Sequence, residues 1–178
     1  PSGPPPIFKL ISYSTEGLMT EGLRGRPRPW VAMGCRVDGG ECRGALRPGL
    51  PWSGLVCLAV TDSTNRVALE MAENGGLHGT VVIADAQTAG RGRMGRRWMS
   101  PAGKNLYVSL LLRPSVPTVD APRLALVAGV ALAAAVEAMG GSASLQWPNA
   151  LYCGGRQAAG LLAALASGPA GGRPAGSG

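Results

Sequence analysis

The residues best suited to chemistry lie in one basic, glycine-rich stretch, residues 87–98, with the sequence QTAGRGRMGRRW. Glycines alternating with arginines let a backbone approach a ligand closely, while guanidinium groups bind phosphate or carboxylate through paired hydrogen bonds. The net charge of +7, which comes mostly from arginine, favours an anionic partner of this kind. The charge does not choose among phosphates, nucleotides and nucleic acid.

Three kinds of loop are consistent with this stretch. It contains a GxGxxG pattern at Gly90, Gly92 and Gly95, but a dinucleotide-binding loop needs a helix to begin there, and the following WMSPAG does not predict one. Four arginines beside Trp98 could instead contact the phosphates and a base of a nucleic acid. The third interpretation is a solvated charged loop without a function.

Regular elements are predicted on both sides of this loop. Asp62 or Ser63 can cap a first helix, and Asp120, with Pro122 in the first turn, can cap a second, alanine-rich helix. Because the second helix is apolar on nearly all sides, we expect it to be buried. The predicted order is strand 55–60, helix 62–74, strand 80–86, loop 87–104, strand 105–113, helix 120–140, and a hairpin of strands 143–153 and 156–166. This order predicts an α+β domain with a mixed β-sheet packed with helices.

The flanking segments differ in composition from this central domain, residues 55–167. Residues 1–54 and 168–178 are rich in proline and glycine, so we expect them to be largely disordered, with a short strand at 7–13. Residues 1–54 show no helix–turn–helix periodicity, and no DNA-binding domain is expected there. The first residue is proline, which favours a fragment or a processed chain.

The cysteines and the hydrophobic runs indicate the compartment. The four cysteines form no CxxC pair and His78 is the single histidine, so we expect no metal site and reduced thiols in a cytoplasm. No apolar run reaches the eighteen or so residues of a membrane-spanning helix, which predicts a soluble cytoplasmic protein.

Five motifs, in order and in register, resemble those of biotin–protein ligases. They are DSTN at 62–65, GTVVIADAQTAGRGRMGRRW at 79–98, SP with NLYVS at 100–109, QWPN at 146–149 and GRQAAGLL at 155–162. The resemblance implies a biotin/lipoate–protein ligase-like catalytic fold, similar to class II aminoacyl-tRNA synthetases. The family continues through further strands after Ser167, so we expect an incomplete domain with an exposed sheet edge at its end. Lipoate ligases share this architecture, but the Arg-Gly-Arg loop favours biotin.

The resemblance also implies a two-step reaction. The biotin carboxylate attacks the α-phosphate of ATP, with Mg²⁺ implied as a cofactor, and a lysine of a biotin carboxyl-carrier protein or domain then takes biotin from the adenylate. The mixed anhydride hydrolyses if water reaches it, so a mobile loop that closes over it fits the chemistry.

The resemblance assigns roles to individual residues. For biotin they are Ser63, Thr64, Asn65, Gln87, Arg91, Gly92 and Arg93; for the nucleotide, Arg93, Arg96, Trp98 and Asn149; for catalysis, Arg93 and Gln157. Four of them have a plainer alternative: Ser63 and Thr64 are ordinary helix caps, Trp98 can anchor the loop, and Asn149 can be a turn residue.

Three positions depart from the family's pattern, and each replaces a charged residue with a neutral one. Gln146 and Gln157 stand where the family has lysine, and Ala150 stands where it has aspartate. Losing one preorganised charged donor costs on the order of a hundred- to a thousandfold in rate. The sequence therefore predicts a biotin–protein ligase with impaired activity, and the alternative is a non-catalytic remnant that binds biotin, biotinyl-adenylate or a protein partner.

Overall fold

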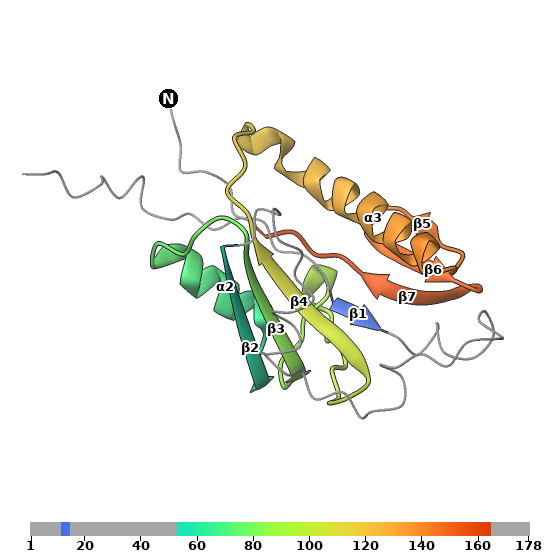
Figure 1. Cartoon of the computed structure of the whole chain (residues 1–178), viewed down its shortest axis with the longest axis horizontal. Helices are drawn as coiled ribbons and strands as arrows, with labels where there is room; N and C mark the ends of the chain where they lie inside the picture. The colour runs from blue at the N-terminus through green and yellow to red at the C-terminus, as the bar shows by residue number, and fades with distance from the viewer. Residues whose placement is uncertain (1–11, 15–52, 165–178) are drawn as a thin grey trace, which may run out of the picture.

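In the computed structural model, which describes residues 12–14 and 53–164, seven strands form one sheet in the order β2-β3-β4-β1-β7-β6-β5 (Figure 1). The strands are β1 (Ser12–Ser14), β2 (Gly54–Thr61), β3 (Thr80–Gln87), β4 (Asn105–Leu111), β5 (Ser144–Gln146), β6 (Ala150–Cys153) and β7 (Arg156–Gly160). β2 and β3 are parallel, and the other neighbouring pairs are antiparallel. The predicted α+β fold with a mixed sheet is confirmed.

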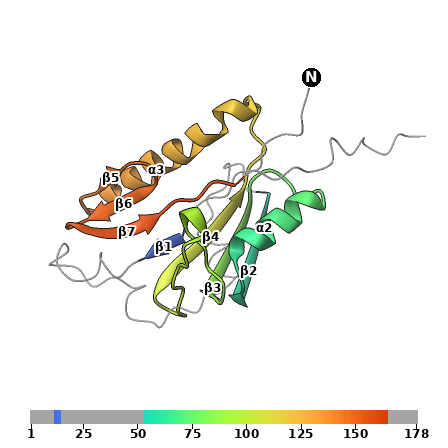
Figure 2. The ribbon, with the colours of Figure 1, turned by 180° about the vertical axis from the view of Figure 1, so that it is seen from behind.

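Two helices pack on different parts of this sheet. α2 (Thr64–Glu73) connects β2 to β3 and contacts β3 and β4, whereas α3 (Ala121–Ala138) lies along β5–β7 (Figure 2). Short 3-10 turns, η1 (Arg93–Gly95) and η2 (Thr118–Asp120), complete the described elements. Ser63 and Asp120 occupy the N-cap positions as predicted, but neither side chain caps the helix backbone. The Asp120 carboxylate instead accepts a bond from Arg123 at 2.8 Å.

The buried apolar residues fall into separate clusters on the two halves of the sheet. One cluster joins α3 to β6 and β7 and contains Val136, Leu151, Cys153, Ala158 and Ala159. Two others join residues of α2 and β2–β4: Ala72 with Leu111, and Leu55 with Val81 and Ile83. Because β1 pairs with β4 on one side and β7 on the other, it joins the two halves.

The predicted C-terminal hairpin is wrong in its first strand. Residues 143–153 form two strands, β5 and β6, because the chain reverses through residues 147–149, where Pro148 has no N–H to offer a sheet. The predicted edge at the end of the chain is also misplaced. The last described strand, β7, lies inside the sheet between β1 and β6, and β2 and β5 are the edges.

The prediction that α3 is buried on all sides is wrong as well. Val136 is buried and faces the sheet, but Val127 and Val130 on the opposite side are 61% and 59% exposed. The nearly uniform apolar composition of α3 carries no information on which side meets the sheet, so the sequence could not show this. No helix within the described ranges is long and apolar enough to cross a membrane.

The predictions for the flanking segments lie largely outside the described residues. The strand expected at 7–13 overlaps β1, which the structure places at Ser12–Ser14. The remainder of 1–52 and the tail 168–178 belong to the undescribed part, so their predicted disorder and the expected lack of a DNA-binding domain stay predictions.

Candidate functional site

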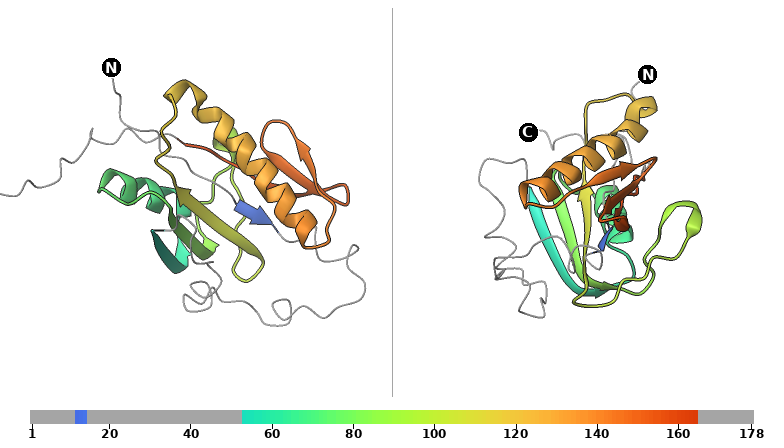
Figure 3. Two further views of the ribbon diagram at one scale, coloured as in Figure 1. Left: turned by 45° about the horizontal axis from the view of Figure 1, so that its top comes forward. Right: turned by 90° about the vertical axis from the view of Figure 1, so that its right-hand side faces the viewer.

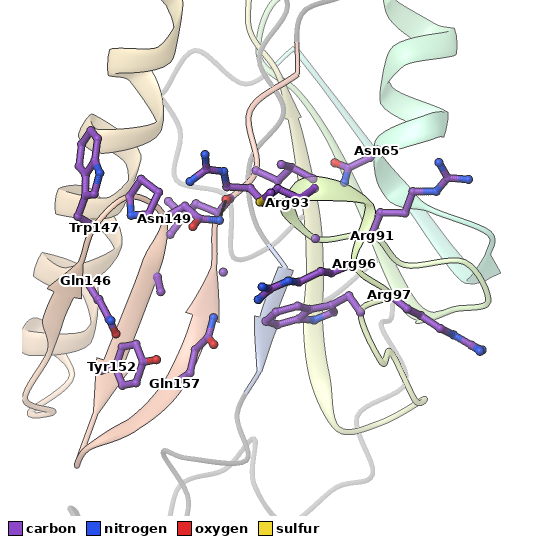
Figure 4. Close-up of a pocket in the computed structure, with 18 residues that line it drawn as sticks. Asn65, Arg91, Arg93, Arg96, Arg97, Gln146, Trp147, Asn149, Tyr152 and Gln157 are labelled. Carbon is purple, nitrogen blue, oxygen red and sulfur yellow. Dashed lines mark hydrogen bonds between the residues drawn. The ribbon is translucent and has the colours of Figure 1, made fainter.

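A pocket of about 440 Å³ lies between the loop 91–98 and the β5–β7 part of the sheet (Figure 4). It brings together residues from motifs that are far apart in the sequence. The predicted site residues that line it are Asn65, Arg91, Gly92, Arg93, Arg96, Trp98, Asn149 and Gln157, together with Gln146 and Ala150. The predicted biotin residues Ser63, Thr64 and Gln87 do not line it.

The loop 91–98 is a tight turn closed by its own backbone. Gly92 N–H donates to the Arg96 carbonyl at 2.7 Å, and Trp98 N–H donates to the Gly90 carbonyl at 2.9 Å. A Cβ atom at Gly90 would stand 2.6 Å from Ser100 Oγ and 2.7 Å from the Trp98 carbonyl oxygen, so this position requires glycine. The chain turns where Met94 adopts a φ of 57°. These backbone hydrogen bonds therefore fix the conformation of the loop from which the side chains extend.

The four arginines of this loop divide into two pairs. Arg93 and Arg96 point toward β5–β7 across the pocket, whereas Arg91 and Arg97, which face each other across a β-bridge, point away from it (Figure 4). All four side chains are exposed. Arg93 and Arg96 therefore give the pocket a positive wall that fits a phosphate or a carboxylate.

The opposite wall is neutral and polar. Tyr152 and Gln157 are cross-strand neighbours on β6 and β7, and both line the pocket with Gln146 (Figure 4). The Gln157 side-chain nitrogen donates to the Ala159 carbonyl at 3.3 Å, so its amide is held along its own strand. This wall supplies hydrogen-bonding groups without charge.

Asn149 holds the end of this wall where the chain enters β6 and leaves β7. Its side-chain nitrogen donates to the Leu161 carbonyl at 2.8 Å, and the Leu161 N–H donates to the Asn149 carbonyl at 2.8 Å. Asn149 thus connects the turn before β6 to the segment after β7. The structure supports the plainer role as a turn residue, and the placement of Asn149 at the pocket leaves room for a ligand contact as well.

Trp98 joins the loop to the neutral wall. Its half-buried ring lies against Gly160 of β7, where a Cβ atom would be 3.2 Å from Trp98 Cη2. The ring also lines the pocket, so it both anchors the loop and offers a flat apolar surface to a ligand.

A partly buried polar network supports the pocket from the side of α2. The Gln87 side-chain oxygen accepts from the Thr64 backbone N–H at 3.0 Å and lies 3.2 Å from its hydroxyl, and Gln87 Nε2 donates to Ser100 Oγ at 3.0 Å. Fully buried Ser109 lies 2.9 Å from Thr64 Oγ1 and donates to Asn65 Oδ1 at 2.6 Å. Gln87 therefore holds the start of α2 and the end of the loop together.

Ser109 and Tyr152 are two polar residues of this site to which the sequence analysis assigned no role. Ser109 stands between the buried residues Tyr107 and Leu111 on β4, at an inward position of an alternating strand. A polar residue at an inward position is the signal that could have identified it. Tyr152 could have been found only from its pairing with Gln157, which requires the correct hairpin register.

The charged side chains around the pocket are cationic, and no acidic side chain from the described part of the chain lines it. Mg²⁺ in proteins is held by one or two carboxylates plus substrate phosphates, so the residues present do not fit a metal held by the protein. Among the described residues, no group of three or more His, Cys, Asp or Glu side chains is placed to hold a metal ion.

Asp62 lies outside the pocket, and its hydrogen bond from Arg66 holds the pKa of this carboxyl below its usual value.

Comparisons with known proteins agree with one another. A family model described as the biotin/lipoate A/B protein ligase family matches residues 57–168. The bifunctional ligase/repressor BirA of Bacillus spizizenii is 36% identical over 83% of this chain and 46% of its own length. The biotin–[acetyl-CoA-carboxylase] ligase of Paracoccus denitrificans is 44% identical over 63% of this chain and 48% of its own. The chain thus spans about half the length of these relatives.

Solved structures give the same result for the fold. Biotin protein ligase from Aquifex aeolicus, in complex with biotin and ATP, is 32% identical with a TM-score of 0.52, over 63% of this chain and 51% of that chain. The biotin acetyl coenzyme A carboxylase synthetase from Helicobacter pylori, with bound biotinylated ATP, is 25% identical with a TM-score of 0.51, over 58% of this chain and 51% of that chain.

Proposed function

Because this chain belongs to the biotin/lipoate A/B protein ligase family, we propose that it binds biotin and ATP in the pocket between the loop 91–98 and β5–β7. There it joins them into biotinyl-adenylate and transfers biotin to a lysine of a carboxyl-carrier protein in the cytoplasm. The observation that carries the proposal is that one pocket unites Asn65, the arginine loop and the Asn149–Gln157 wall.

The positive wall is suited to the first chemical step. A biotin carboxylate oxygen attacks the α-phosphorus of ATP, a new C–O–P linkage forms, and pyrophosphate leaves with the electrons of the broken P–O bond. Arg93 and Arg96, which point across the pocket, would bind the phosphate oxygens as negative charge concentrates there (Figure 4). The Trp98 ring would lie against the adenine.

The polar network is suited to the other end of biotin. Asn65 accepts from Ser109 through its side-chain oxygen, which leaves its amide nitrogen to donate to a ligand in the pocket. Gln87 and Thr64 are hydrogen-bonded to each other, so they would act mainly by holding Asn65 and the loop in place. In the second step the acceptor amine attacks the biotinyl carbonyl, and AMP leaves with the electrons of the C–O bond.

The neutral wall is expected to slow this chemistry. Gln157 carries no charge at the place where the resemblance implies a lysine, and its amide is already bonded to Ala159. The same observation favours the second candidate function, a protein that binds biotin or biotinyl-adenylate without turnover. Both functions require ligand binding in the same pocket, and only turnover separates them.

Ligand binding to the whole chain tests the proposal. We expect biotin and biotinyl-adenylate to raise the thermal midpoint, because a ligand that binds only the folded state stabilises it. We also expect biotinyl-adenylate to slow trypsin cleavage after the exposed arginines of the loop 91–98. If titration calorimetry detects no binding heat and the thermal midpoint does not change at millimolar ligand, the proposal is wrong. Protection by a short nucleic acid alone, with affinity falling steeply in salt, would assign the loop to nucleic-acid binding.

A further inference from the structure

Ser100 is a buried serine whose side chain does not line the pocket. It is 7% exposed. It belongs to the connection between β3 and β4, the lime segment that leaves the sheet and returns to it (Figure 3). A buried polar side chain is nearly always hydrogen-bonded, so the partners of this hydroxyl indicate what it does.

Two hydrogen bonds join Ser100 to Gln87 and close the base of the connection. The Gln87 backbone N–H donates to the Ser100 carbonyl at 3.0 Å, and Gln87 Nε2 donates to Ser100 Oγ at 3.0 Å. The side-chain oxygen of Gln87 is bonded in turn to Thr64 at the start of α2. Ser100 is therefore held in place from the sheet and from α2, independently of the arginines in the loop.

The Ser100 hydroxyl also contacts the residue that carries the flat apolar surface of the pocket. Because its oxygen accepts from Gln87, its single proton can be donated to the Trp98 carbonyl, 3.3 Å away. On the other side, the Trp98 N–H donates to the Gly90 carbonyl at 2.9 Å. The backbone of Trp98 is thus held at both its N–H and its carbonyl, with the ring against Gly160.

We propose that Ser100 is a positioning residue for the nucleotide end of the pocket, which acts by holding Trp98 where its ring faces the ligand. This inference rests on the proposed function, in which the adenine lies against that ring. Stacking of a base on an aromatic ring contributes about fivefold or more to affinity, and it depends on where the ring lies. Ser109 bears on the other end of the pocket, because its hydroxyl donates to Asn65 at 2.6 Å.

Two matched serine variants separate these ends. Ser100→Ala should lower the affinity of the whole chain for AMP about fivefold or more. It should leave the affinity for biotin nearly unchanged, because Gln87 keeps its bonds to Thr64. Ser109→Ala, at an equally buried serine, should show the reverse pattern. Titration calorimetry measures all four affinities.

The outcomes distinguish this inference from the proposed function. An unchanged AMP affinity in Ser100→Ala would overturn the positioning role, and so would an equal loss for AMP and biotin, which is the pattern of a purely structural serine. A wild-type chain that binds neither AMP nor biotin would contradict the proposed function itself.

A double-mutant cycle tests whether Ser100 acts through Trp98. In a Trp98→Leu chain, which has no indole ring to position, Ser100→Ala should cause no further loss of AMP affinity, because both changes remove the same contact. Two losses that add in full would contradict the proposal. If circular dichroism shows that Ser100→Ala does not fold, Ser100→Cys provides the same test, because it retains a side chain of similar shape and weakens the hydrogen bonds.

Discussion

The Trp98 ring rests on the backbone of Gly160, close enough that a Cβ atom there would stand 3.2 Å from Cη2 and 3.3 Å from Cζ3 of the ring. One residue comes from the arginine loop and the other from β7. This contact therefore sets how far the two walls of the pocket stand apart.

Gly160→Ala should push the Trp98 ring away from β7. We expect a loss of about 1–3 kcal/mol in the free energy of unfolding, typical of an overpacked site, and weaker binding of biotinyl-adenylate. Urea denaturation and isothermal titration measure the two effects. Gly54→Ala is the control, because a Cβ there meets Thr80 at an ordinary 3.8 Å. Equal behaviour of the two variants would show that the Trp98 contact does not shape the pocket.

Ser109→Ala should weaken both the fold and the biotin end of the site. The substitution removes a buried hydroxyl and leaves Asn65 without its bond partner at 2.6 Å, at a cost of about 1–3 kcal/mol in unfolding free energy. The affinity for biotin, measured by titration calorimetry, should fall as well. The exposed Ser144→Ala on β5 is the control. Unchanged biotin affinity in a folded Ser109→Ala protein would exclude the positioning role of this network.

Gln157→Lys should raise the rate of adenylate formation. A cation facing the charge that develops between carboxylate and phosphate should recover about a hundred- to a thousandfold in rate, measured as pyrophosphate release. Arg156→Lys, one residue away and exposed, is a control that adds no charge. A wild-type chain that already turns over as fast as Gln157→Lys would show that the neutral wall is no defect.

Asp62 should make stability depend on pH on the acid side. Its folded-state pKa is lowered, chiefly by the hydrogen bond from Arg66, so the contribution is present above the unfolded pKa of about 3.9 and is lost as pH falls through the lower folded value. Asp62→Asn should therefore differ from wild type in urea midpoint at pH 7, and the difference should shrink as pH falls through the lowered folded pKa. Glu73→Gln, outside this ion pair, is the control and should show no such convergence.

Much of the site could be predicted because it lies in contiguous motifs. The resemblance assigned the loop 91–98, Asn149 and Gln157 to a single site. In the structure they line one pocket. The sheet order could not be predicted, because strand periodicity shows which side of a strand is buried and not which strand it pairs with. The exposed side of α3 could not be predicted for a similar reason, since apolar residues surround the helix.

The sheet order also has a consequence for how the protein assembles. β1, at Ser12–Ser14, pairs with Tyr107 of β4 and with Gly160 of β7, so the sheet is continuous between the two cores through a strand that comes early in the sequence. Contacts between residues so far apart in the sequence are slow to form, because the entropy of closing the long intervening loop opposes them. During synthesis on the ribosome, β1 must wait for nearly the whole described chain to emerge before its second neighbour exists. The pocket is therefore among the last parts of the molecule to take shape.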